Sequence, residues 1–258
     1  MNNLKQKINY YFPVIIFFVL SLISWELIVR FLEIKSWILP APSAIFMEII
    51  NTRSLLIQHS FRTLFEAIGG LTISALAGLL VGAIIFRFKI LARTLYPLMV
   101  ISQTVPIVVL IPLLVIWFGF GILPKLLIVI LACFFPVAVN TVDGLNQADQ
   151  AKINLLKAMG ASTWQIFLKL RVPTALPMIF SGLKISATYS VMAAVVAEWM
   201  GSDLGLGVFI VRSSNSYLTS RVFAGIALVS LFSIILFQLV NFLEKIIIPG
   251  PKKKKEEI

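Results

Sequence analysis

The side chains that could do chemistry in this chain are a few polar and acidic groups inside long apolar runs. Glu26 and Glu198 are acids in such positions, and Arg30, four residues after Glu26, favours a structural ion pair. Ionisable groups in a membrane face a cavity or another helix and often mark solute or proton paths. His59 is the single histidine, with no second His, Cys or acid near it at metal-ligand spacing. We therefore expect no metal site, no nucleophile and no general base, and so no enzyme.

One apolar run holds the densest group of polar and helix-breaking residues, namely Ser102, Gln103, Thr104, Pro106 and Pro112. Its prolines free backbone carbonyls, and irregular backbone at membrane depth is tolerated where it lines water or protein. Gln103, Thr104 and Pro106 are therefore predicted to line a translocation path. The alternative is that these groups bond neighbouring helices.

A later apolar run offers a second candidate for that path. Ser186 and Tyr189 stand three residues apart and are predicted to share a helix face that meets the solute. Glu198 lies near the end of the same run, and Asp203 follows it. These two acids are predicted to gate the outer mouth or to contact a partner protein outside the cell. A plain structural hydrogen bond is the alternative for Glu198.

Composition places all these groups in a membrane protein. Hydrophobic residues make up 59% of the chain and charged residues 13%, and the mean hydropathy is +0.99. A soluble domain has about 45–50% apolar and about 25% charged residues. The apolar runs leave no room for a separate globular domain, so we expect one transmembrane domain over residues 1–258, surrounded by the lipid bilayer. The net charge of +11 does not indicate nucleic acid, because the basic residues flank the apolar runs.

The number of spans follows from the length of the apolar runs. A helical span needs roughly 20 apolar residues to cross about 30 Å of hydrocarbon. Six stretches fit, at about 12–31, 67–86, 96–118, 123–142, 178–200 and 222–242. Backbone amides in lipid must be satisfied within their own segment, so the spans should be helices. The predicted fold is all-α and polytopic.

Orientation follows from the basic residues between the spans. If both termini are cytoplasmic, 15 of the 22 Lys and Arg residues lie inside, among them Lys5, Lys7 and Lys252 to Lys255. The other 7 lie outside. The positive-inside bias therefore favours this arrangement. It places the polar segment 143–177 in the cytoplasm.

Segment 143–177 is longer than a connection between neighbouring helices needs. It begins with a helical pattern whose narrow polar stripe contains Gln150, Asn154 and Lys157. Gly160 then stands where a helix would end in a left-handed cap. The pattern predicts a first helix that ends at this glycine.

A second helix is predicted directly afterwards. Ser162 and Gln165 have the spacing of a capping box, and Pro173 and Pro177 are expected to stop the helix. The resulting helix-turn-helix has more apolar surface than a solvated loop exposes, which indicates a partner. Packing on the protein's own spans or on the lipid interface would also cover it.

The stretch "LLKAMGASTWQIFLKLRVPTALP", residues 155–177, resembles the conserved cytoplasmic loop of permease subunits in ATP-binding-cassette importers. In that loop a helical "EAA" element precedes a glycine and a later "LP". The stretches "IPLLVIWFGFGILPKLLIVILACFFPVAVNTVDGL" and "SGLKISATYSVMAAVVAEWMGSDLGLG" look like the nitrate/sulfonate/taurine-type permeases, especially the branch for thiamine-pyrimidine precursors. The resemblance implies a type I importer permease fold and a path for a small solute delivered by an extracellular binding protein.

The coupling residues implied by this resemblance depart from the family pattern at one point. Where relatives have Glu-Ala-Ala, this chain has Asn154, Leu155 and Leu156. The resemblance implies that the element sits in a groove of a separate ATPase subunit. Without the carboxylate, docking is expected to rest on apolar packing around Gly160, through Leu155, Leu156, Met159 and Ala161.

The energy source must lie on another polypeptide, because the chain has no G-x-x-x-x-G-K-[ST] loop to cradle phosphates. The resemblance implies a homodimer of this chain with two ATPase subunits that bind ATP and Mg²⁺, in the cell membrane of a prokaryote. Pyrimidine vitamin precursors, sulfonates and nitrate all remain open as solutes. The alternative is a stand-alone transporter driven by protons through Glu26 or Glu198.

Overall fold

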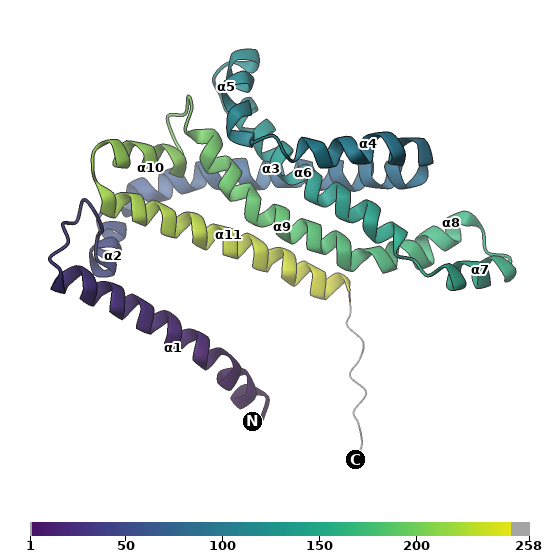
Figure 1. Cartoon of the computed structure of the whole chain (residues 1–258), viewed down its shortest axis with the longest axis horizontal. Helices are drawn as coiled ribbons and strands as arrows, with labels where there is room; N and C mark the ends of the chain where they lie inside the picture. The colour runs from purple at the N-terminus through teal and green to yellow at the C-terminus, as the bar shows by residue number, and fades with distance from the viewer. Residues whose placement is uncertain (1, 249–258) are drawn as a thin grey trace.

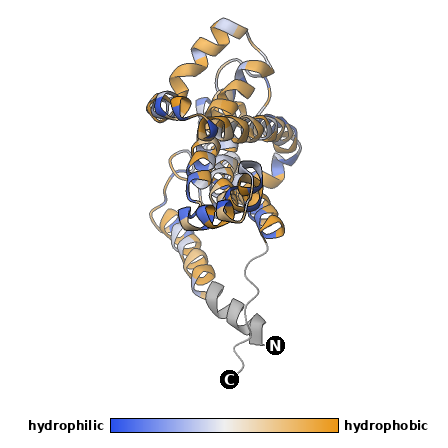
Figure 2. Cartoon of the chain, turned by 90° about the vertical axis from the view of Figure 1, so that its right-hand side faces the viewer, coloured by the Kyte–Doolittle hydropathy of each residue, from blue (hydrophilic) through white to orange (hydrophobic). Residues whose placement is uncertain are grey.

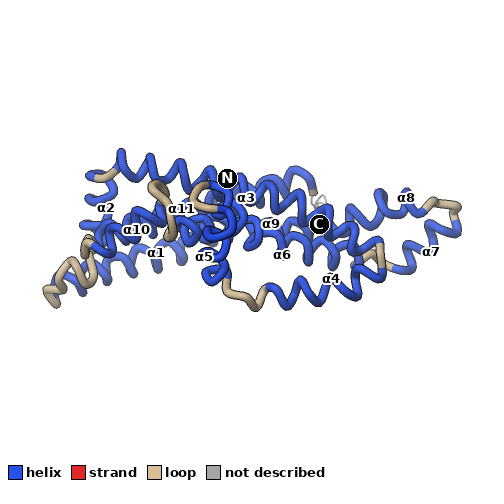
Figure 3. Tube along the Cα trace, turned by 90° about the horizontal axis from the view of Figure 1, so that it is seen from above, coloured by secondary structure: helices blue, strands red, loops and turns tan. Residues whose placement is uncertain are grey.

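The computed structural model describes the backbone of residues 2–248 and the side chains of residues 12–248, and the regular elements in this part of the chain are all helices, joined by loops (Figures 1 and 3). The helices are α1 (Asn2–Phe31), α2 (Pro42–Asn51), α3 (Arg53–Arg87), α4 (Lys89–Ser102), α5 (Ile107–Phe118), α6 (Ile122–Asn146), α7 (Gln150–Ala158), α8 (Thr163–Ile166), α9 (Val172–Glu198), α10 (Leu206–Asn215) and α11 (Thr219–Ile247). A π-helical segment, Phe167–Arg171, joins α8 to α9. The all-helical prediction is confirmed. Lys252 to Lys255 and the side chains of Lys5 and Lys7, which entered the charge count, lie outside the described residues.

The core is made by α3, α6 and α9, which pack along one another, with α11 against α9 (Figure 1). Hydrophobic residues predominate along the helices (Figure 2), and many large apolar side chains are exposed. Lipid therefore gives no hydrophobic drive for association, and close van der Waals contact must hold the helices together. Small residues supply that contact. A Cβ added at Gly78 would lie 2.8 Å from Cβ of Val137, and one at Gly182 would lie 2.6 Å from the Pro136 carbonyl. We call the end of the bundle that carries α10 the α10 end, and the opposite end, which carries α7 and α8, the α7–α8 end (Figure 1).

Helix α1 stands apart from the bundle and meets it near the α10 end (Figure 1). It contacts α2 there, and the ring of Trp25 lies 5.7 Å from that of Phe223 in α11. The predicted pair between Glu26 and Arg30 forms, with 2.6 Å between Oε1 and Nε. Glu26 also accepts hydrogen bonds from the backbone and the hydroxyl of Ser43. The pair is therefore structural, because it ties α1 to the start of α2.

The predicted span 96–118 is not one continuous helix. It is formed by α4 and α5, which are bent by 99° at the break between Ser102 and Ile107. Pro106 has no amide to continue the first helix and disfavours a helical residue before it, so the chain turns here. Within residues 2–248, five helices are long and apolar enough to span a membrane, or six if this bent pair counts as one span.

The prediction that Pro173 and Pro177 end the second helix of segment 143–177 is wrong. The chain stays helical from Thr163 to Glu198, and Pro177 lies inside α9. In the π segment the Val172 amide donates to the Phe167 carbonyl five residues back, which shifts the register just before Pro173. A proline near the start of the new register costs little, because its missing amide is not required there.

Close contact between α6 and α9 predicts that Gly182→Leu destabilises the bundle. The new side chain would overlap the Pro136 carbonyl and the side chain of Asn140. Overpacking of this kind costs about 1–3 kcal/mol, so the melting temperature of the detergent-purified protein should fall. Thr188→Leu, which adds the same side chain at an exposed position of α9, is the control. Equal melting temperatures for the two variants would contradict the prediction.

Candidate functional site

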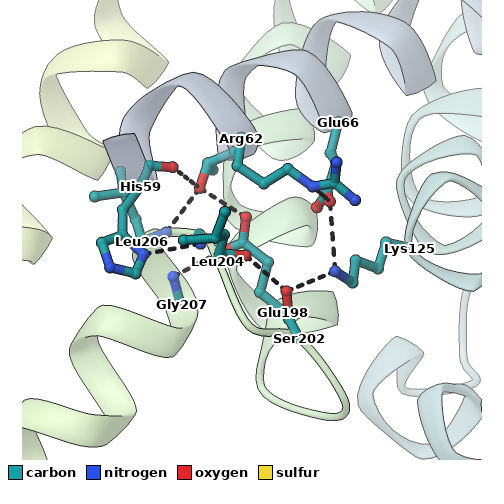
Figure 4. A network of polar contacts seen from close by, with 11 residues as sticks. His59, Arg62, Glu66, Lys125, Glu198, Ser202, Leu204, Leu206 and Gly207 are labelled. Atoms are coloured by element: carbon teal, nitrogen blue, oxygen red, sulfur yellow. Dashed lines mark hydrogen bonds and ion pairs between the residues drawn. The ribbon is translucent and has the colours of Figure 1, made fainter. Parts of the chain in front are cut away.

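At the α10 end a buried carboxylate joins three helices (Figure 4). Glu198, in the last turn of α9, is fully buried. Its Oε1 accepts a hydrogen bond from the Thr63 hydroxyl of α3 at 2.7 Å, and its Oε2 accepts one from the Gly207 amide of α10 at 2.6 Å. Each oxygen therefore has a donor in place of water. We call this group, with His59 and the amides of residues 205–207, the carboxylate clamp.

The clamp satisfies the first amides of α10, which have no acceptor within their own helix. The Leu206 amide donates to Oγ1 of Thr63 at 2.8 Å, and the Gly205 amide donates to Nδ1 of His59 at 2.9 Å. Because Nδ1 accepts, the neutral His59 ring carries its proton on Nε2. Three successive backbone amides are thus held by side chains from α3 and α9, and His59 is the acceptor for the first of them.

Only glycine fits at the turn that enters α10. Gly205 has φ +133°, a conformation that L side chains rarely adopt, and a Cβ there would overlap the Glu198 carboxyl group. The backbone can therefore approach the carboxylate closely.

A second, ionic group lies beside the clamp and ties down the loop 199–205. Glu66 of α3 is fully buried and pairs with Arg62 at 2.8 Å and with Lys125 of α6 at 3.5 Å. Lys125, itself buried, donates to the Ser202 hydroxyl at 2.6 Å, and Ser202 donates to the Leu204 carbonyl. This chain of contacts, drawn in Figure 4, holds the loop against α3 and α6.

The two predicted acids of the outer mouth lie in different surroundings. Glu198 is enclosed in the clamp, which corresponds to the structural hydrogen bond considered as the alternative. Asp203 is exposed on the loop 199–205. It lines a cavity of about 410 Å³, together with Arg62, Phe120 and Lys125.

The structure does not bring Ser186 and Tyr189 to one surface. Ser186 is fully buried and donates to the Cys133 carbonyl of α6 at 2.7 Å, whereas Tyr189 is 45% exposed. Ser186 therefore bonds two helices. By contrast Gln103, Thr104 and Pro106 are all exposed, together at the break between α4 and α5.

The helix–glycine–helix element at the other end forms as predicted. Gly160 has φ +83°, and the Ala161 amide behind it donates to the Leu156 carbonyl. Ser162 and Gln165 make both hydrogen bonds of the capping box, at 2.8 and 3.2 Å. The start of α7 is also capped, since the Asp149 carboxylate accepts from the Ala151 amide. Local hydrogen bonds thus fix this turn without help from the spans.

The apolar side chains of this element divide into two sets. Leu156 and Ala161 pack inward on a small core around Ile153 and Ile166. Leu155 and Met159 point outward and are 62% and 74% exposed. Trp164, which was not among the coupling residues predicted from the sequence, is 66% exposed on α8. Its position two residues after the cap at Ser162 was the available signal.

These features define a class of protein, namely a multi-pass helical membrane subunit that carries a rigid capped helix pair at one end. The chain belongs to the family of binding-protein-dependent transport system inner membrane components, whose model matches residues 71–248. It is 37% identical to the formylaminopyrimidine transport permease protein ThiX of Halalkalibacterium halodurans over 93% of this chain and 96% of the relative. It is 30% identical to the putative aliphatic sulfonates transport permease protein SsuC of Bacillus subtilis over 86% and 81%. Among solved structures, the MetNI methionine transporter matches with a TM-score of 0.64 at 20% identity, over 78% of this chain and 97% of that one.

The chain is therefore the permease subunit of an ATP-driven importer, of the nitrate/sulfonate/taurine type. The resemblance stated from the sequence is confirmed, and so is the fold. The comparisons support this function over a stand-alone transporter driven by protons. Glu26 and Glu198, the acids that such a transporter would have used, are held in hydrogen bonds that join helices.

The clamp predicts that Glu198→Ala loosens the start of α10. The Gly207 amide would lose its acceptor, and a buried polar group left unsatisfied costs about 1–3 kcal/mol. We expect a lower melting temperature and faster proteolysis within the loop 199–205. Asp203→Ala, which removes an exposed carboxylate from the same loop, is the control. A Glu198→Ala protein as stable and as protease-resistant as this control would show that the clamp is dispensable.

Proposed function

We propose that this permease docks its α7–α8 element onto a separate ATPase subunit at the cytoplasmic face, works as a homodimer, and admits a small neutral solute of the pyrimidine type. The observation that carries the proposal is the exposed apolar surface of Leu155, Met159 and Trp164 on a turn fixed by its own caps. Exposed apolar patches of this kind mark interaction sites. The charge bias of the sequence supports a cytoplasmic place for this surface, with both termini on that side of a prokaryotic plasma membrane.

Docking rests on shape more than on charge. Asn154, which replaces the acid of related loops, accepts a hydrogen bond from Gln150 on its own helix at 3.0 Å. Its side chain can offer a partner a polar contact but no ionic one. Met and Trp are suited to such an interface, because one adapts to an irregular groove and the other brings a large apolar area. ATP and Mg²⁺ are assigned to the partner subunit in this proposal.

The proposed homodimer encloses the path between two copies of the break. On α5, Val109, Ile116 and Trp117 are exposed apolar residues that a second copy would cover. Gln103 and Thr104 are exposed at the start of the same region. Two copies facing each other here would place amide and hydroxyl groups around a central passage and keep apolar surface away from water.

The chemistry of the break supports a neutral solute. Gln103 and Thr104 donate and accept hydrogen bonds, and the break from Gln103 to Pro106 contains no cation to neutralise a sulfonate or nitrate. A pyrimidine has ring nitrogens and amino groups that match such partners. The higher identity to a formylaminopyrimidine permease, 37% against 30% for the sulfonate permease and 26% for a nitrate permease, supports the same choice. An extracellular binding protein is proposed to deliver the solute.

Docking predicts that Leu155→Glu prevents co-purification of the ATPase subunit. Burying a new carboxylate against an apolar groove is costly, so the complex should dissociate while the permease itself stays folded. Gln147→Glu, which adds the same charge at an exposed position before α7, is the control. Recovery of equal amounts of ATPase with both variants would refute docking at this surface.

Uptake of the solute gives a separate prediction. Vesicles that contain the permease, its ATPase and its binding protein should accumulate formylaminopyrimidine with ATP present, and an uncoupler should not prevent this. Gln103→Leu should reduce uptake roughly twofold to tenfold, because a lost hydrogen bond to a buried solute is worth about 0.5–1.5 kcal/mol. Val105→Leu, an apolar change at the same break, should have little effect. Uptake of a sulfonate or nitrate instead would show that the choice of solute is wrong.

A further inference from the structure

A column of four side chains runs from α8 into the membrane-spanning bundle. The rings of Trp164 and Phe167 are stacked, with centroids 5.5 Å apart and planes at 20°. Phe167 stacks in turn on Phe86, in the last turn of α3, at 6.3 Å and 27°. The Arg171 guanidinium lies 4.9 Å from the centroid of Phe86. We call these residues the aromatic column.

Arg171 extends the column to a third helix. Its Nη1 donates to the Leu145 carbonyl in the last turn of α6 at 2.9 Å. Carbonyls at a helix C-terminus have no partner within the helix, and a cation there is favourable. Phe167 and Leu145 also pack with Val172 and Ile179 of α9 in one apolar cluster. The column therefore joins the ends of α3, α6 and α9.

The π segment carries two residues of the aromatic column on the side that faces Phe86. It runs from Phe167 to Arg171, and these two side chains both meet Phe86. The segment is also the packed connection between α8 and the bundle, since it contacts α6 and α9 while α7 packs on α8. Figures 1 and 3 show α7 and α8 projecting beyond the bundle. A force on this projection reaches the bundle through the π segment and through the short connection 147–149 between α6 and α7.

We propose that Phe86, Phe167 and Arg171 are positioning residues of the transport cycle. They make α8 and the adjoining ends of α3 and α6 move as one body when the ATPase subunit displaces the α7–α8 element. The inference rests on the proposed docking and adds which contacts carry the motion onward. Without the column, α8 would pivot at the π segment, and hydrolysis would continue without moving the helices.

The first test measures this motion without any solute. Spin labels at Thr163→Cys in α8 and Arg87→Cys at the end of α3 report one distance in the permease–ATPase complex, and native Cys133 is buried and out of reach. With the column intact, this distance should be the same in the nucleotide-free and the Mg·ATP-bound complex. In Phe167→Ala it should change or broaden on ATP binding. Phe135→Ala, which removes a half-buried ring of α6 outside the column, should behave as the intact protein does.

The second test measures formylaminopyrimidine uptake per ATP hydrolysed. Phe167→Ala and Phe86→Ala should each reduce this ratio roughly twofold to thirtyfold, the range found for residues along coupling networks. The double variant should reduce the ratio by less than the product of the two single effects, because both variants remove the shared stack of Phe86 on Phe167. Phe167→Tyr should keep the ratio of the unaltered protein, because the aromatic ring remains. Arg171→Lys should lower the ratio, because lysine lacks the planar guanidinium. Phe86→Leu keeps apolar volume without the stack and serves if an alanine variant does not fold.

The outcomes separate the two proposals. Failure of the ATPase to co-purify with the unaltered permease would overturn the docking. A docked complex in which Phe167→Ala keeps the unaltered spin-label distance would overturn the role of the column. So would a docked complex in which Phe135→Ala lowers the uptake ratio as much as Phe167→Ala does.

Discussion

A carboxylate without water must find its donors within the protein, and Glu198 meets this constraint by joining helices that are far apart in sequence. Its partner Thr63 lies 135 residues earlier in the chain. Burial of an unpaired polar group in a membrane costs several kcal/mol. The carboxylate is therefore tolerated only while α3, α9 and the start of α10 are together, which makes the clamp a condition for the arrangement of the whole α10 end.

Helices α3 and α9 are also held together at their opposite ends, by a different kind of interaction. At the α10 end, hydrogen bonds join α3 to α9. At the α7–α8 end, stacked rings and a guanidinium join α3 to the π segment that leads into α9. Between these ends, α6 fits both helices through glycines such as Gly78 and Gly182, which allow backbones to approach closely. Helices fixed at two ends and packed closely in the middle resist bending. Displacement at one end should then appear at the other as a rigid movement.

Features that depend on neighbours in sequence could be predicted, and those that depend on distant contacts could not. The capping box of Ser162 and Gln165 and the turn at Gly160 follow from local hydrogen bonds. Hydropathy predicted five of the six spans as single helices, because lipid imposes length and composition, but it did not show the 99° bend within 96–118. The predicted helix end at Pro173 was wrong, because a π segment shifts the helical register just before this proline. For Ser186 and Glu198 the residue type showed that a polar partner was needed, but only the packing of α6 and α3 shows which one.

The proposed docking does not depend on the acidic residue that related loops carry. The Asn154 side chain accepts a hydrogen bond from Gln150, so two polar side chains of α7 bind each other on the same helix. The apolar residues Leu155 and Met159 stand beside it, held outward by a turn that backbone and capping hydrogen bonds fix. A rigid presentation of apolar surface loses little conformational entropy on binding, which favours affinity without an ion pair. Specificity for one ATPase would then come from the shape of a groove, so a partner whose groove is built around an ionic contact should fit this permease poorly.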